Sequence, residues 1–124
     1  MNARYVRLAA DAEGESHFED LEVVLERQDF APPAAPLDIA QFLPADGTLW
    51  VGAEPDWAGD AAHPSPRRQL FCIVQGSCDV TASDGDVRSF GRGSVLLLED
   101  TTGRGHSTSV TGNEELLVFA VTLA

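Results

Sequence analysis

Short apolar runs separated by turn-forming residues dominate this sequence, and no segment repeats its apolar residues at helical spacing. Short runs bounded by Gly, Asp, Asn or Pro are typical of β-strands. The strongest turn signal is Asp84-Gly85, a pair that favours a two-residue hairpin turn. The pattern therefore predicts an all-β chain, with strands expected at 5–8, 17–25, 49–53, 70–74, 77–82, 87–90, 95–99, 106–110 and 116–123.

The first third of the chain differs from the rest. Residues 30–36 contain three prolines, which cannot donate ladder hydrogen bonds, so this segment must be an irregular crossing or an edge. The later strands follow one another at a spacing typical of a sandwich or barrel. We therefore expect residues 1–44 to supply N-terminal strands and a Pro-rich crossing that pack on a barrel formed by residues 45–124.

A second turn is expected at Gln75-Gly76, where it would join strands 70–74 and 77–82 in a hairpin. Two cysteines, Cys72 and Cys78, flank this turn, but counting outward from it does not place them opposite each other. We interpret them as reduced, buried and apolar, as expected for a cytoplasmic protein.

Three of the expected strands, at 70–74, 95–98 and 116–121, are apolar on both faces. A half-exposed antiparallel strand would alternate apolar and polar residues instead. Some outward faces of the barrel must therefore be covered. Two covers are consistent with the sequence: the N-terminal third of the chain, or a second subunit in a homodimer.

The net charge limits the kinds of partner. Twenty acidic residues against eight basic ones leave a formal charge of −12, so nucleic acid and anionic membrane surfaces are poor partners. No stretch approaches the ~20 apolar residues needed to span a bilayer, and the first residues do not resemble a secretory signal. We expect a cytoplasmic protein whose partner is a small molecule, with no nucleic-acid or membrane partner.

One stretch resembles the first motif of the cupin family. That motif reads Gly, His-x-His, three or four residues, Glu, six residues, Gly. This sequence has His63, Ser65, Gln69 and Gly76 at the four positions that follow the opening Gly. Only the first His and the last Gly keep the family's identity.

A later stretch resembles the second cupin motif, which reads Gly, five residues, Pro-x-Gly, two residues, His. Gly93 opens it, Glu99 stands where proline is usual, and His106 comes two residues later than the family spacing. The resemblance covers roughly residues 45–123. It implies a single-domain cupin: a double-stranded β-helix, or jelly-roll-type antiparallel barrel.

The resemblance also implies where a metal would bind. In metal-binding cupins, imidazoles and one carboxylate hold a divalent ion inside the barrel, and such donors suit Fe, Mn, Ni, Cu or Zn. This chain offers only His63, His106 and the neutral amide oxygen of Gln69. The loss of one imidazole and of the carboxylate charge should weaken binding by orders of magnitude. The site therefore holds either one divalent transition metal on these three residues or no cofactor.

Two classes of function stay open for such a barrel. As an enzyme, the chain would carry out metal-dependent oxygenation, or isomerase or lyase chemistry, with His63 or His106 as metal ligand or general base. As a binding protein, it would hold a small metabolite in a polar, metal-free pocket. The changes at two of the four ligand positions favour the metal-free alternatives.

Further pocket residues are expected close to these motifs. Arg67 shares strand parity with Gln69 and would point into the barrel if the strand continued through it. A buried guanidinium needs an anionic partner, either Glu99 or a carboxylate or phosphate of the ligand. The ligand is therefore expected to be an anion if no internal salt bridge forms. Trp50 and Trp57 flank the region, and Trp50 is expected to contact the substrate.

Overall fold

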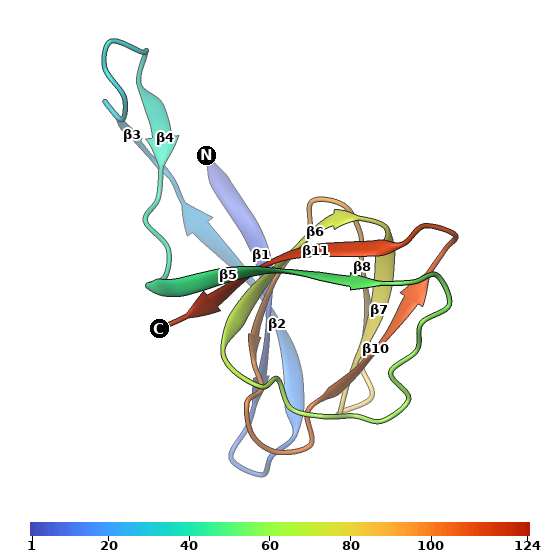
Figure 1. Ribbon diagram of the computed structural model, residues 1–124. Helices are drawn as coiled ribbons and strands as arrows, with labels where there is room; N and C mark the ends of the chain where they lie inside the picture. Colours follow the sequence, from blue (N-terminus) through green and yellow to red (C-terminus); the bar gives the residue numbers. More distant parts are fainter.

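The computed structural model describes residues 1–124 and consists of strands joined by turns and loops (Figure 1). It contains no helix, and therefore none that is long and apolar enough to cross a membrane. The strands are β1 (Asn2–Ala10), β2 (Ser16–Val24), β3 (Glu26–Gln28), β4 (Leu37–Ile39), β5 (Ala45–Ala53), β6 (Gln69–Gln75), β7 (Ser77–Ala82), β8 (Val87–Phe90), β9 (Val95–Glu99), β10 (His106–Thr111) and β11 (Leu116–Leu123). The predicted all-β fold is confirmed.

Two sheets enclose the core of the molecule (Figure 1). The larger has six strands in the order β2-β1-β9-β6-β11-β5, and the smaller has the order β10-β7-β8. All pairings are antiparallel except that of β1 with β9, where Val6 lies opposite Leu96. Side chains that point between the sheets form a core cluster of 11 buried residues, of which Leu8 and Val118 are almost completely buried.

The predicted hairpin at Gln75-Gly76 is wrong. β6 belongs to the six-stranded sheet and β7 to the three-stranded one, so the chain turns a corner between sheets at this point. Gly76 has a φ of 76°, and a Cβ there would lie 2.6 Å from the carbonyl oxygen of Glu115. Only glycine fits such an approach. The hairpin at Asp84-Gly85 is confirmed, because β7 and β8 pair with Thr81 opposite Val87. Its loop is longer than the expected two residues, since the Ala82 N–H donates to the carbonyl oxygen of Asp86 and residues 83–85 lie between them.

The N-terminal segment contributes to the larger sheet and also forms a projection. β1 and β2 pair along their whole length at one edge of the six-stranded sheet. The hairpin β3–β4 projects away from the barrel, and residues 30–36 lie in its loop (Figure 1). The sequence did not indicate β3 and β4, because each has only three residues and neither alternates apolar and polar residues over a useful length.

The outward face of the larger sheet is covered in part by the chain itself. Leu70, Leu97 and Leu123 form a second buried cluster, against which Leu43 packs. Nearby, Phe42 meets the Tyr5 ring edge-on, with a centroid separation of 5.0 Å. Self-coverage thus accounts for this part of the face. Coverage of the remaining part by a second subunit stays a prediction.

Candidate functional site

A cavity of about 410 Å³ lies inside the barrel between the two sheets. Of the 20 residues that line it, 13 are hydrophobic, including Phe71, Ile73 and Leu96 from the larger sheet and Val80 from the smaller one. No Asp, Glu, Lys or Arg lines this cavity. Four of its polar residues come from the loop before β6, the first residue of β6 and the first residue of β10. We call them the polar end: His63, Ser65, Gln69 and His106.

The two histidines of the polar end are joined through their backbones. His63 lies in the loop before β6, and His106 is the first residue of β10. Each backbone N–H donates to the carbonyl oxygen of the other at 3.0 Å, and the two ring centroids are 5.4 Å apart. Gly105 permits this approach: its φ is 71°, and a Cβ there would lie 2.0 Å from the carbonyl carbon of His63.

Both imidazoles use Nδ1 for a contact within the chain, although His106 is buried and His63 is exposed. His63 Nδ1 lies 2.8 Å from the carbonyl oxygen of Pro64, which can only accept, so Nδ1 carries the hydrogen. His106 Nδ1 lies 2.5 Å from Oδ2 of Asp100, a group that accepts when it is ionised. A neutral imidazole carries one ring hydrogen, so Nε2 of each histidine is left as an acceptor.

Gln69 and Ser65 are both buried beside the histidines. The Gln69 Nε2 amide donates to Ser65 Oγ at 3.2 Å, and Ser65 Oγ donates to the carbonyl oxygen of Arg67 at 2.7 Å. The hydroxyl hydrogen of Ser65 is therefore used within the protein. The amide oxygen of Gln69 accepts no hydrogen bond from the protein, which gives the polar end a third free acceptor.

Asp100 lies behind His106 and was not among the residues indicated by the sequence. Its side chain is completely buried, and its backbone carbonyl accepts the N–H of Ser65 at 3.0 Å. One carboxylate oxygen contacts His106, whereas Oδ1 has no hydrogen-bond partner. The only sequence signal was the loop of residues 100–105, whose two glycines mark a tight bend before His106.

The structure places Arg67 outside the barrel, so the expectation that it points inward is wrong. β6 begins at Gln69, and strand parity therefore does not extend back to Arg67. The guanidinium instead lies 2.8 Å from Asp46 on the surface. The expected anionic ligand depended on Arg67, and no cationic side chain replaces it in the cavity.

Glu99 also lies outside the cavity, contrary to expectation. Its carboxylate accepts hydrogen bonds from Arg7 Nε at 2.6 Å and from Arg68 Nε at 2.7 Å. Burial raises the pKa of Glu99, but the hydrogen bonds and charges of the two arginines outweigh this effect, so the pKa lies below its ordinary value. Glu99 thus balances charge on the outer face and does not contact the cavity.

The two tryptophans lie on different sides of the sheet. Trp50 is 60% exposed and packs edge-on against Phe119, at a centroid distance of 5.0 Å, so the expectation that it lines the pocket is wrong. Trp57, in the loop after β5, lines the cavity instead. Strand parity explains the position of Trp50, since its neighbour Val51 points into the barrel and Trp50 must point out.

The donors present do not make up the metal centre that the cupin resemblance implies. His63 and His106 could each offer Nε2, and Gln69 could offer a neutral oxygen. No group of three or more His, Cys, Asp or Glu side chains is placed to hold a metal ion. With two imidazoles and no carboxylate facing the cavity, the residues do not fit a resident ion of that kind.

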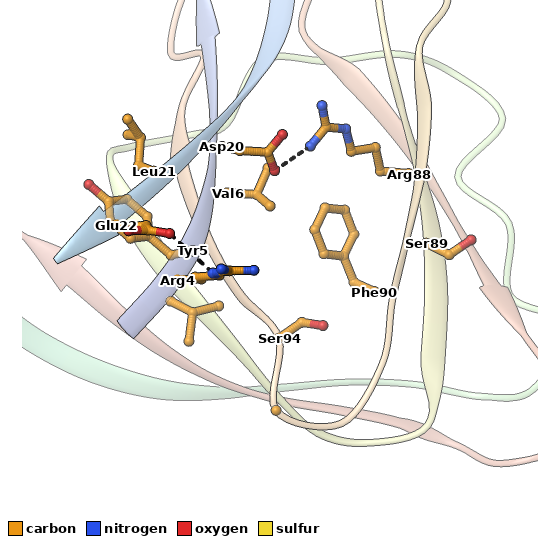
Figure 2. Close-up of a pocket in the computed structure, with 12 residues that line it drawn as sticks. Arg4, Tyr5, Val6, Asp20, Leu21, Glu22, Arg88, Ser89, Phe90 and Ser94 are labelled. Atoms are coloured by element: carbon orange, nitrogen blue, oxygen red, sulfur yellow. Dashed lines mark hydrogen bonds and ion pairs between the residues drawn. The ribbon is translucent and has the colours of Figure 1, made fainter. Parts of the chain in front are cut away.

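A second, more open hollow of about 620 Å³ lies between β1, β2 and β8 (Figure 2). Its charged side chains pair with one another: Arg4 with Glu22 at 3.1 Å, and Arg88 with Asp20 at 2.8 Å (Figure 2). These charges are therefore already satisfied by neighbours on the same surface. The cavity inside the barrel is the better candidate, because its polar groups converge and keep free acceptors.

Comparisons with known proteins bear on the fold alone. No protein family model matches the sequence, and no curated protein is similar to it. Among solved structures, the chain is similar to a Cupin 2 conserved barrel domain protein from Salinispora arenicola, with 20% identity, a TM-score of 0.48, and coverage of 81% of this chain and 74% of the other. It is also similar to the cupin domain of Schizosaccharomyces pombe Cnp3, with 14% identity, a TM-score of 0.50, and coverage of 100% and 83%. The second likeness spans the whole chain and agrees with the two-sheet barrel, so this protein has the cupin fold.

Proposed function

We propose that the protein binds a small, neutral molecule in its barrel cavity, and that this molecule has an apolar body and a hydrogen-bond-donating head group. The observation that carries the proposal is the polar end. Nε2 of His63, Nε2 of His106 and the amide oxygen of Gln69 are acceptors without a protein partner. A hydroxyl group of the ligand would supply the missing donor.

The charge and size of the cavity support a neutral ligand. A buried anion without a cationic partner is strongly unfavourable, and no Lys or Arg lines the cavity. The apolar walls would instead stabilise the ligand body by about 25 cal/mol for each Å² removed from water. A volume of about 410 Å³ lies within the range of small-molecule sites.

A matched set of aromatic compounds tests this proposal. Phenol, anisole and benzoate are similar in size, but only phenol is a neutral donor. We expect phenol to raise the melting temperature of the protein and to bind more tightly in calorimetry than anisole, and we expect benzoate to show no binding. Tighter binding of benzoate than of phenol, or equal binding of phenol and anisole, would contradict the proposal.

The two tryptophans provide matched variants for the same titration. Trp57→Ala removes a side chain that lines the cavity, whereas Trp50→Ala removes one from the outer face. We expect the first to weaken phenol binding about tenfold, since it removes roughly 1.4 kcal/mol of contact, and the second to leave binding unchanged. Equal effects would show that phenol binds elsewhere.

A further inference from the structure

We propose that the cavity also carries out a proton transfer, in which His106 takes the proton of the ligand's head group and Asp100 stabilises the charge that results. The inference rests on the proposed function and adds an activity to it. The substrate class is an acidic phenol or enol, one whose O–H has a pKa close to that of an imidazolium, so that an imidazole can accept its proton.

The surroundings of Asp100 carry this inference. Its side chain is 0% exposed, and its single hydrogen-bond partner is His106, at 2.5 Å. Oδ1 is buried and has no partner, so half of the carboxylate's capacity to accept is unused. A buried carboxylate is costly unless a positive charge lies next to it. Protonation of His106 at Nε2 creates that charge on the ring that Asp100 already contacts.

No other charged residue supplies a positive charge next to Asp100. The arginines closest along the chain are engaged elsewhere: Arg104 pairs with Glu15, and Arg92 pairs with Glu114. Arg68 pairs with Glu99, the residue before Asp100. The cavity itself is lined by no charged residue. His106 is therefore the one group beside Asp100 that can become a cation.

The two histidines differ in how strongly the partner of Nδ1 would stabilise a protonated ring. The Nδ1 hydrogen of His63 bonds to the neutral carbonyl of Pro64, which does little to stabilise an imidazolium. The Nδ1 hydrogen of His106 bonds to a carboxylate, which stabilises an imidazolium strongly. We therefore assign proton transfer to His106 and an accepting role without transfer to His63, with Asp100 as the positioning residue.

The step is balanced within the complex. The O–H bond of the head group breaks, the Nε2–H bond of His106 forms, and the electron pair stays on the ligand oxygen. Asp100 keeps its charge and takes no proton. The new Nε2–H donates to the ligand oxyanion, so the ion pair forms inside a low-dielectric cavity, where it is strongest.

The probe for the experiment is 4-nitrophenol, whose phenolate absorbs visible light whereas its phenol form does not. The control is 4-nitroanisole, which has the same body and no hydroxyl hydrogen. The titration is done at a pH between the ordinary histidine pKa of about 6.5 and the pKa of free 4-nitrophenol, so that free 4-nitrophenol is mainly neutral and an ordinary ligand-free imidazole is mainly unprotonated. Binding is followed by calorimetry. We expect wild-type protein to bind 4-nitrophenol as the phenolate, with the His106 Nε2 resonance in ¹⁵N NMR moving to its protonated position.

Asp100→Asn keeps the size of the side chain and an oxygen that can accept from Nδ1, but it removes the charge. We expect this variant to bind 4-nitrophenol mainly as the neutral phenol, with the bound phenolate fraction at least tenfold lower, while Trp50→Ala behaves as wild type. If Asp100→Asn does not fold, His106→Gln tests the same step and should likewise lose the phenolate band.

The outcomes separate this inference from the proposed function. Binding of 4-nitrophenol by wild-type protein in its neutral form would overturn the proton transfer and leave the binding proposal standing. An unchanged phenolate fraction in Asp100→Asn would overturn the role of Asp100. Binding of 4-nitroanisole as tight as that of 4-nitrophenol would overturn the donor requirement itself.

Discussion

Polar groups on the outer face of the larger sheet are paired with one another, whereas those on its inner face are left without protein partners. On the outer face, Arg7 and Arg68 both donate to Glu99, so the charges of that cluster are paired. On the inner face, Gln69 follows Arg68 directly in sequence, yet its amide oxygen has no protein partner, and both histidines beside it keep a free Nε2. Two residues that are adjacent in sequence thus have different roles: Arg68 forms an ion pair, and Gln69 keeps a free acceptor.

This difference separates groups that hold the fold from groups that are available to a ligand. Partly exposed ion pairs contribute only about 0–1 kcal/mol each, and they are complete without any other molecule. The acceptors of the polar end have no protein partner, so they are free to accept from a donor that a ligand brings. The predictions below test this distinction, from the largest expected effect to the smallest.

The largest effect is expected at Gly105, which lets the two histidines approach. A Cβ there would meet the His63 backbone at 2.0 Å, whereas a Cβ at Gly85 would meet nothing within 4 Å, although both residues have positive φ. We expect Gly105→Ala to cost about 3 kcal/mol or more of unfolding free energy and to abolish phenol binding. Gly85→Ala should cost about 1–2 kcal/mol and leave binding intact. Chemical denaturation of both variants measures the difference, and equal costs would contradict the close approach.

A charge placed at the polar end should convert it into a metal site. Gln69→Glu is nearly isosteric and adds an anionic oxygen beside two imidazoles. We expect Ni²⁺ or Mn²⁺ affinity to rise tenfold or more, which needs only about 1.4 kcal/mol, and Ser65→His to raise it further. Calorimetric titration and thermal melting are measured together. Unchanged affinity with a lowered melting temperature would mean that the three side chains do not converge.

The outer face should tolerate a loss of charge without consequence for the cavity. Glu99→Gln leaves the guanidinium groups of Arg7 and Arg68 without their anion. Because both arginine side chains are more than a third exposed, at 38% and 42%, the expected cost is only about 1 kcal/mol. Phenol binding should stay as in wild type, and a tenfold loss would show that the two faces are coupled.

The smallest effect concerns His17, which joins two turns on the surface. Its ring nitrogens lie 2.7 Å from Asp11 and 2.8 Å from Asp84, so both can donate to a carboxylate when the ring is protonated. These hydrogen bonds raise the pKa of His17 above its ordinary value of 6.5. The stability that the charged ring contributes is therefore present below that ordinary value and lost as pH rises through the raised pKa.

The check is a pair of pH series. Melting temperatures of wild-type protein and of His17→Gln are measured from pH 5 to pH 9, a range chosen around the ordinary histidine pKa of about 6.5. The difference between the two proteins should shrink towards the alkaline end. A difference that grows with pH would reverse the sign and reject the interpretation of His17 as a charged bridge.

Most of the strands could be predicted because local turn chemistry marks them. Asp84-Gly85 was correctly identified as a hairpin, since the preference for that turn lies in the two residues themselves. Gln75-Gly76 carries a weaker local turn signal, and there the chain turns a corner between sheets, because Gly76 packs against Glu115, far away in sequence. Local chemistry shows that a chain turns and does not show which sheet it enters next.

The site could be predicted only where the motif itself supplied the residues. His63, Gln69 and His106 were indicated by their spacing, and the structure places all three at one cavity. Arg67 was misplaced because parity was extended beyond the start of β6. Asp100 was missed because its importance lies in a contact with His106 across a loop, which no periodicity reveals.

The central claim is that the polar end offers unprotonated Nε2 atoms to a ligand, and ¹⁵N NMR of the imidazole rings tests it most directly. The ligand-free protein is measured at a pH well above the ordinary histidine pKa of about 6.5. We predict that His63 and His106 both carry their hydrogen on Nδ1, with Nε2 resonating as an unprotonated, pyridine-type nitrogen. An Nε2-protonated tautomer in either ring would contradict the account, because that ring would then offer a donor to the cavity in place of an acceptor.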